Sequence, residues 1–161
     1  MKTKKGFTLM ELLIVIAIIG VLSAIVLASL RLAKSRGSDA AVQSTLASIR
    51  SQAEIYFDSN ANYGDVIATG ECPSSGTSIF AADDTIKNQL ASVVTTGGGL
   101  VSCMTDSPAS GNATKWAIAA QLKSDPLKAW CVDSNGVSTV RDLSDTTQAE
   151  LDSKVSGGIC N

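Results

Sequence analysis

The sequence predicts an α+β fold in which one long N-terminal helix packs on a small antiparallel β-sheet. Three observations indicate it. No Pro interrupts residues 7–59, an apolar stripe continues past a purely apolar N-terminal run, and an Asn-Gly turn separates two strand-like segments near the C-terminus. Pro breaks helices, apolar residues at helical spacing mark a buried face, and Asn-Gly is the strongest short hairpin signal.

The apolar run from Leu12 to Leu30 contains no charged residue and is long enough to cross a membrane. A helix of 19 residues spans roughly 28 Å, about one hydrocarbon core. Three lysines precede the run and an acidic segment follows it, which predicts a cytoplasmic N-terminus. A cleaved secretory signal, cut after Ser23-Ala24 or Ala28-Ser29, is the alternative, but such signals have shorter apolar cores.

The helical pattern continues beyond the apolar run with a single stripe of apolar side chains. They follow one another at spacings of 4, 3, 4 and 3 residues: Val42, Leu46, Ile49, Ala53 and Tyr56. This spacing places them on one helical face. The first stop signal is the polar segment at 59–64, so we expect one helix from Phe7 to about Ser59.

The remaining chain predicts a small domain that lies on this stripe. Residues 60–80 are loop-like, and Asp83-Asp84 can start a short helix that the glycines at 97–99 end. Strands are expected at residues 100–104, 115–122, 129–133 and 137–141.

Four cysteines, at positions 72, 103, 131 and 160, lie beyond the apolar run. They form no CxxC motif, and the chain has no His to complete a Cys/His zinc site. We expect two disulfides in an oxidising compartment, with four reduced, buried thiols as the alternative. Four cysteines allow three pairings, and the residues alone do not choose among them.

Composition argues against several classes of function. The formal net charge is −2, and without the three lysines before Phe7 the chain has 10 basic and 15 acidic residues, so nucleic-acid binding is not indicated. The chain has no His to activate a Ser or Thr nucleophile. Gly97-Gly98-Gly99 has no adjoining Lys-Ser/Thr, so it does not match a phosphate-binding loop. We therefore expect no enzyme, no catalytic residue, no metal ligand and no cofactor.

Glu11 is an acidic residue at the start of an apolar run. Placing a carboxylate at membrane depth costs free energy, so such a residue suggests a functional role. The alternative is that the Glu11 side chain only reaches the headgroups. The segment Lys4-Lys5-Gly6-Phe7-Thr8-Leu9-Met10-Glu11 resembles the class III signal of type IV pilins and of the pseudopilins of type II secretion and competence systems. The resemblance covers roughly residues 4–30.

This resemblance implies a processing and assembly route. A prepilin peptidase would cut between Gly6 and Phe7 and methylate the new amine of Phe7. Glu11 would then pair with that amine on a neighbouring subunit, which sets the register of a helical homopolymer. The subunit would start as a single-pass inner-membrane protein, reach an assembly platform there, and end in an extracellular or periplasmic filament. Many relatives have Pro where this chain has Ala28, so either the helix stays unbroken or the chain is a minor subunit.

The resemblance also implies a disulfide pairing. Many pilins tie the last loop to a strand, which matches Cys131 and Cys160 and leaves Cys72 and Cys103 for each other. Major pseudopilins use calcium in this region, so a calcium site stays open as an alternative to solvated acidic side chains. The candidate residues match no EF-hand loop: Asp142, Asp145, Glu150 and Asp152.

The long helix packed on its small sheet resembles the roll of the pilins. The expected organisation has five parts. They are a leader peptide (1–6), a transmembrane and filament-core segment (7–30), an amphipathic helix half (31–59), an αβ-loop with a short helix (60–114), and a sheet with a C-terminal disulfide loop (115–161). The expected function is a structural subunit of a type IV pilus. The alternatives are a minor pilin, a pseudopilin of a type II secretion or DNA-uptake system, and a membrane-anchored enzyme or binding module.

Overall fold

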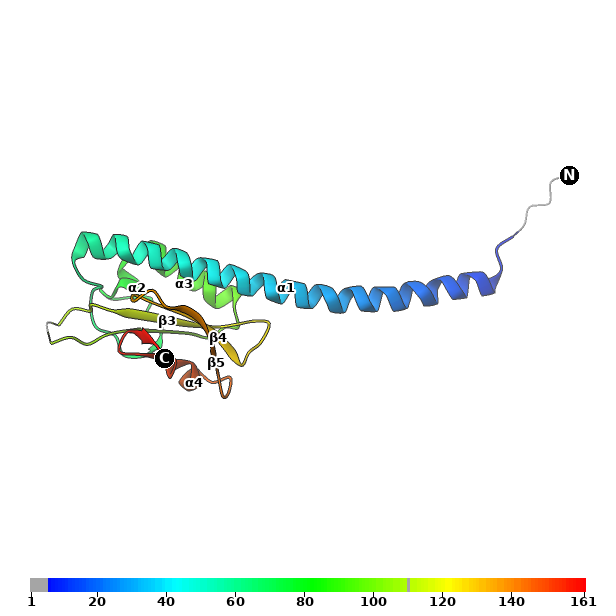
Figure 1. Ribbon diagram of the computed structural model, residues 1–161. Helices are drawn as coiled ribbons and strands as arrows, with labels where there is room; N and C mark the ends of the chain where they lie inside the picture. The colour runs from blue at the N-terminus through cyan, green and yellow to red at the C-terminus, as the bar shows by residue number, and fades with distance from the viewer. Residues whose placement is uncertain (1–5, 110) are drawn as a thin grey trace. The chain divides into compact units, whose positions relative to one another are not determined.

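The computed structural model describes residues 6–109 and 111–161 of the chain (Figure 1). The chain divides into two units, the first ending at Ser35 and the second comprising Arg36–Asn161. Helix α1 (Leu9–Asn60) extends through both, close to the predicted bounds. The leader lysines fall outside the described residues. The predicted α+β fold, with a long helix and a small antiparallel sheet, is confirmed.

Within the second unit, α1 buries the predicted stripe. Val42, Leu46, Ile49 and Ala53 are at most 1% exposed, and Tyr56 packs against the same cluster. A polar contact lies at the N-terminal end of this stripe, where the buried Asp39 carboxylate accepts hydrogen bonds from the backbone N–H groups of Lys123 (2.6 Å) and Ser124 (3.2 Å). These bonds attach the helix to the turn between two strands.

The main sheet has five antiparallel strands in sequence order. They are β1 (Gly70–Glu71), β2 (Val101–Thr105), β3 (Trp116–Gln121), β4 (Lys128–Asp133) and β5 (Ser138–Asp142). Two helices precede β2, α2 (Ile79–Ala82) and α3 (Asp84–Thr96), and the C-terminal segment contains α4 (Gln148–Asp152), β6 (Val155–Ser156) and β7 (Ile159–Cys160). As predicted, α3 is capped by Asp83, which accepts from the Ile86 N–H at 2.9 Å.

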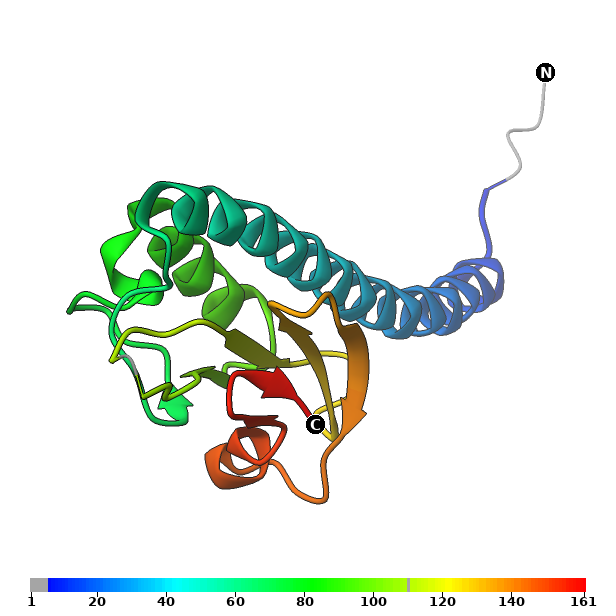
Figure 2. The same ribbon diagram turned by 60° about the vertical axis from the view of Figure 1, so that its left-hand side comes forward.

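Helices α1 and α3 lie on one face of the sheet and the C-terminal segment lies on the other (Figure 2). Each face has its own apolar layer. Successive residues of a strand point to opposite faces. Accordingly Trp116, Ile118 and Ala120 of β3 pack with α1 and α3, whereas Ala117 and Ala119 pack with the C-terminal segment, which contributes Leu151, Val155 and Cys160.

Several short elements differ from the sequence-based expectation. The segment 60–80 was expected to be loop-like, yet it contains β1 and the start of α2, and the C-terminal segment forms α4, β6 and β7. Two-residue strands and single-turn helices are too short to show a periodic pattern, so their backbone conformation depends on the partners they meet in the fold.

Candidate functional site

Gly6 and Phe7 lie just before α1, separated from it by Thr8, and both are exposed. The Phe7 side chain is 77% exposed. A bond between two exposed residues just outside a helix is open to a peptidase, because its backbone is not held in a helical ladder. The expected cleavage and methylation at this bond stay predictions.

Glu11 forms a capping box with Thr8 at the first turn of α1. The Thr8 N–H and hydroxyl each donate to Glu11 Oε2 at 2.9 Å, and the Glu11 N–H donates to Thr8 Oγ1 at 3.2 Å. This reciprocal arrangement satisfies N–H groups that a helix start otherwise leaves unpaired. The Thr-x-x-Glu spacing before an apolar run is a sequence signal for this capping box, in addition to the resemblance that singled out Glu11.

The capping box leaves part of the Glu11 carboxylate available. Oε1 has no hydrogen-bond partner within residues 6–109 and 111–161, and the residue is exposed. Among the described residues, the carboxylate therefore fixes the helix start through Oε2 alone. A Gln side chain can also close a capping box, so the capping role does not require the charge.

The apolar half of α1 exposes its side chains. Every residue from Gly6 to Lys34 is exposed, and the helix contains an 18-residue window of mean hydropathy 3.0 with none of it buried in the chain. By length and composition this helix can cross a membrane. It continues without a break through Gly20 and Ala28, as expected from the absence of Pro.

The structure joins Cys131 to Cys160 and Cys72 to Cys103, the two pairs that the resemblance implied. The Cα atoms of the two pairs are 5.9 Å and 4.8 Å apart, within the usual range for a disulfide. The Cys131–Cys160 bridge lies in the apolar layer under the C-terminal segment. The Cys72–Cys103 bridge lies in the apolar layer that contains α1.

Three of the four acidic residues considered for calcium make local contacts. Asp145 accepts from the Thr147 N–H and hydroxyl, Asp152 accepts from Gln148, and Glu150 accepts from the Ser144 N–H and forms an ion pair with Lys154 at 2.8 Å. Over the two described ranges, no group of three or more acidic or thiol side chains is placed to hold a metal ion.

Comparisons with known proteins agree with the N-terminal features. Residues 1–27 match the family model described as the prokaryotic N-terminal methylation motif. The chain is 43% identical over 63 residues to the type IV wide pilus major component PilA4 of Thermus thermophilus. These 63 residues are 39% of this chain. The match spans about half (48%) of that relative's length. No solved structure matches.

Proposed function

We propose that the chain is a structural subunit of a type IV pilus, on the support of the methylation-motif match over residues 1–27 and the similarity to a type IV pilus component. In this proposal the prepilin enters the inner membrane with its N-terminus in the cytoplasm. A prepilin peptidase cuts it after Gly6 and methylates the amine of Phe7. An inner-membrane platform then assembles the subunits into a helical filament, and the chain has no enzymatic role.

The observation that carries the proposal is the motif match over residues 1–27 together with the apolar half of α1, in which every residue as far as Lys34 is exposed. Exposed apolar surface of this extent requires lipid or other copies of the same helix as its surroundings. In a filament, the helices of neighbouring subunits replace lipid around one another. The apolar half of α1 thus serves first as the membrane anchor and then as the filament core.

Glu11 would set the register of this packing. Cutting before Phe7 creates a cationic amine at the edge of the apolar helix, one residue from the capping box. In surroundings of low dielectric constant, opposite charges attract strongly and a lone charge is disfavoured. The Oε1 of Glu11, to which no residue of 6–109 and 111–161 donates a hydrogen bond, supports pairing with the amine of a neighbouring subunit, and only one axial offset brings the two together.

Replacing Glu11 and Thr8 separately tests this role. Glu11→Gln keeps a capping side chain but removes the charge, whereas Thr8→Val removes the capping hydroxyl and keeps the charge. We expect Glu11→Gln to be cut normally but to enter filaments poorly when it is co-expressed with the wild type. If the pairing contributes about 1.4 kcal/mol, the mutant-to-wild-type ratio in sheared filaments falls about tenfold below that in the membrane. Thr8→Val should keep nearly equal ratios. Equal ratios for Glu11→Gln, with processing intact, would rule out the pairing.

Processing gives a second prediction. Mass spectrometry of the N-terminus of the assembled protein should find a chain that begins at methylated Phe7. Replacing Gly6 by a bulky residue should leave uncut protein in the membrane. A chain that begins at Met1, or after Ala24, contradicts the proposal.

A pseudopilin of a secretion or DNA-uptake system is the related alternative. It would share the processing and the Glu11 pairing, so neither experiment separates the two. Imaging does separate them, since a pilus subunit is found in long surface filaments that shearing releases, and a pseudopilin is not.

A further inference from the structure

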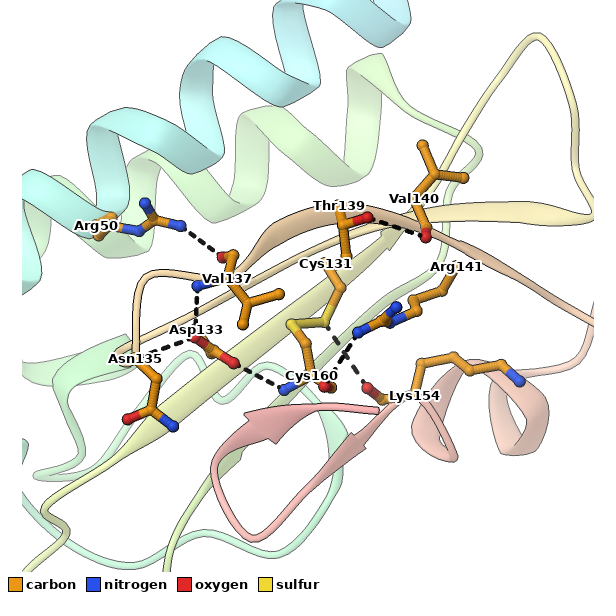
Figure 3. The surroundings of a disulfide bond; sticks show 10 residues. All are labelled: Arg50, Cys131, Asp133, Asn135, Val137, Thr139, Val140, Arg141, Lys154 and Cys160. Carbon is orange, nitrogen blue, oxygen red and sulfur yellow. Dashed lines mark hydrogen bonds between the residues drawn. A yellow bond between two sulfur atoms is a disulfide. The ribbon is translucent and has the colours of Figure 1, made fainter.

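Two side chains of the sheet hold the backbone of Cys160, in addition to its sulfur link (Figure 3). Asp133 Oδ2 accepts a hydrogen bond from the Cys160 N–H at 3.0 Å, and Arg141 Nη2 donates to the Cys160 carbonyl oxygen at 3.2 Å. Cys160 lies on β7, whereas Asp133 and Arg141 lie on β4 and β5. Both contacts involve backbone atoms of Cys160, so neither depends on a disulfide.

Asp133 is a fully buried carboxylate (0% exposed) that the β4–β5 turn holds in place. Its Oδ1 accepts from the N–H groups of Asn135 (2.9 Å) and Val137 (3.0 Å). Arg50 of α1 in turn donates to the Val137 carbonyl oxygen at 2.5 Å. A buried carboxylate must have its oxygens hydrogen-bonded, and here the turn satisfies one oxygen and the Cys160 N–H satisfies the other.

The C-terminal segment also has packing contacts of its own. Leu151 and Val155 are at most 1% exposed in the same layer as Cys160. Gly158, at φ +74°, lies so close to the start of β3 that an added Cβ would be 2.8 Å from the Lys115 Cβ. The hairpin β6–β7 therefore fits this face of the sheet by shape as well as by hydrogen bonds.

Strand alternation separates the cysteines of the sheet. Cys103 is opposite Ile118 and Cys131 is opposite Ala119, and these consecutive residues of β3 point to opposite faces. A formed sheet thus keeps Cys103 and Cys131 apart. The partner of Cys160 is then decided by the face on which the C-terminal hairpin lies.

We infer that Asp133 selects the Cys131–Cys160 pairing, because its carboxylate docks the C-terminal hairpin on the sheet before the sulfur atoms are joined. Pairing proceeds by exchange with a disulfide oxidant such as oxidised glutathione. One cysteine thiolate attacks oxidised glutathione, forms a mixed disulfide and releases one glutathione thiol. The thiolate of the other cysteine then attacks this mixed disulfide and releases the remaining glutathione as a thiol. The protein loses two electrons and two protons, and the oxidant is reduced to two thiols. Docking speeds the second step because it raises the effective concentration of the attacking thiolate.

Oxidative refolding of the full chain in detergent tests the inference. The reduced, denatured protein is refolded in a mixture of reduced and oxidised glutathione, and peptide mapping without reduction follows each pairing with time. Asp133→Asn keeps the side-chain size but loses the charge and one acceptor oxygen. We expect Cys131–Cys160 to form about tenfold more slowly, since a hydrogen bond to a charged group is lost. Asp142→Asn, an exposed carboxylate on β5, is the matched control and should not change the rate.

The Cys72–Cys103 bridge in the same samples reports whether the rest of the sheet has formed. If that bridge forms in Asp133→Asn while Cys131–Cys160 still forms at the wild-type rate, the inference is wrong. A second measurement uses Cys131→Ser/Cys160→Ser, which keeps Asp133 and has no C-terminal bridge. The inference requires the amides of residues 155–161 to stay protected from hydrogen exchange in this variant, and their loss of protection would overturn it even if Asp133→Asn does not fold.

Discussion

At the scale of single residues, several carboxylates of this chain accept hydrogen bonds from backbone N–H groups, among them Glu11, Asp39 and Asp133. Glu11 holds the N–H of Thr8, Asp39 holds two N–H groups of the β3–β4 turn, and Asp133 holds two of the β4–β5 turn and that of Cys160. An ionised acceptor forms stronger hydrogen bonds than a neutral one. Glu11 therefore fixes the start of α1, whereas Asp39 and Asp133 each fix a place where two distant segments of the chain meet.

Tyr63 gives a residue-scale prediction about alkaline stability. Its burial, followed by the negative charge of Glu54 and the hydrogen bond that Tyr63 donates to it at 3.3 Å, raises the pKa of Tyr63 to about 12. The neutral phenol is thus favoured in the folded state. The free energy of unfolding should hold below about pH 10 and fall as the pH rises from 10 to 12, by roughly 2–3 kcal/mol.

Urea unfolding of the full chain in detergent at pH 9 and pH 11.5 measures this effect. Tyr63→Phe should remove most of the decrease, because the ionising group is gone. Tyr56→Phe, a partly buried tyrosine on α1, should keep it. An equal pH dependence in wild type and Tyr63→Phe would contradict the assignment.

At the scale of elements, the second half of α1 has a buried face and an exposed one. Ile49 is 0% exposed and Ile55 is 60% exposed on the same helix. Ile49→Ala should lower the free energy of unfolding by about 2–5 kcal/mol, since it removes buried atoms and leaves a cavity. Ile55→Ala should change it by less than about 0.5 kcal/mol. Chemical denaturation measures both, and similar costs for the two variants would contradict the packing of α1.

Helix α4 gives an element-scale prediction about acid stability. The hydrogen bond from Lys154, then the one from the Ser144 backbone, lowers the pKa of Glu150 to about 2. The folded state therefore favours the carboxylate, whose contribution is present above about pH 4.5 and is lost as the pH falls toward 2. Glu150→Gln should flatten this part of the stability curve in acid titrations followed by circular dichroism. Glu71→Gln, an exposed residue on β1, should leave the curve unchanged.

At the scale of the whole molecule, each disulfide stabilises a different apolar layer. The bridges join residues 31 and 29 positions apart in the sequence, which corresponds to roughly 3–4 kcal/mol each by loss of chain entropy in the unfolded state. The sheet lies between them, so we expect their effects to add.

Removing each pair by Ser substitution, and then both, measures this additivity. The decrease in the free energy of unfolding of the fourfold variant should equal the sum of the decreases of the two double variants within about 0.5 kcal/mol. Peptide mapping of the wild type without reduction provides the control, since it must find the two linkages described. A coupling well above that limit would mean that the two layers do not fold as independent halves of the second unit.

The features that could be predicted from sequence are local or periodic. The motif around Gly6 and Glu11 is continuous in the chain, the stripe from Val42 to Ala53 repeats at helical spacing, and Asn135-Gly136 marks a hairpin by itself. Each depends on residues within a few positions of one another. For this reason the long helix, the sheet and the candidate assembly residues could be predicted from the sequence. The capping role of Thr8 could have been predicted as well, since the Thr-x-x-Glu pattern is local.

What only the tertiary structure decided depends on contacts between distant segments. Asp39 meets a turn 84 residues away, and Asp133 meets Cys160 27 residues away, and nothing in the local pattern marks either as buried. The short elements α4, β6 and β7 form only because a face of the sheet receives them. Which cysteines share a face depends on strand register, and a shift of one residue would place Cys131 on the opposite side. Register comes from the packing of the whole sheet, so no single segment of the sequence determines it.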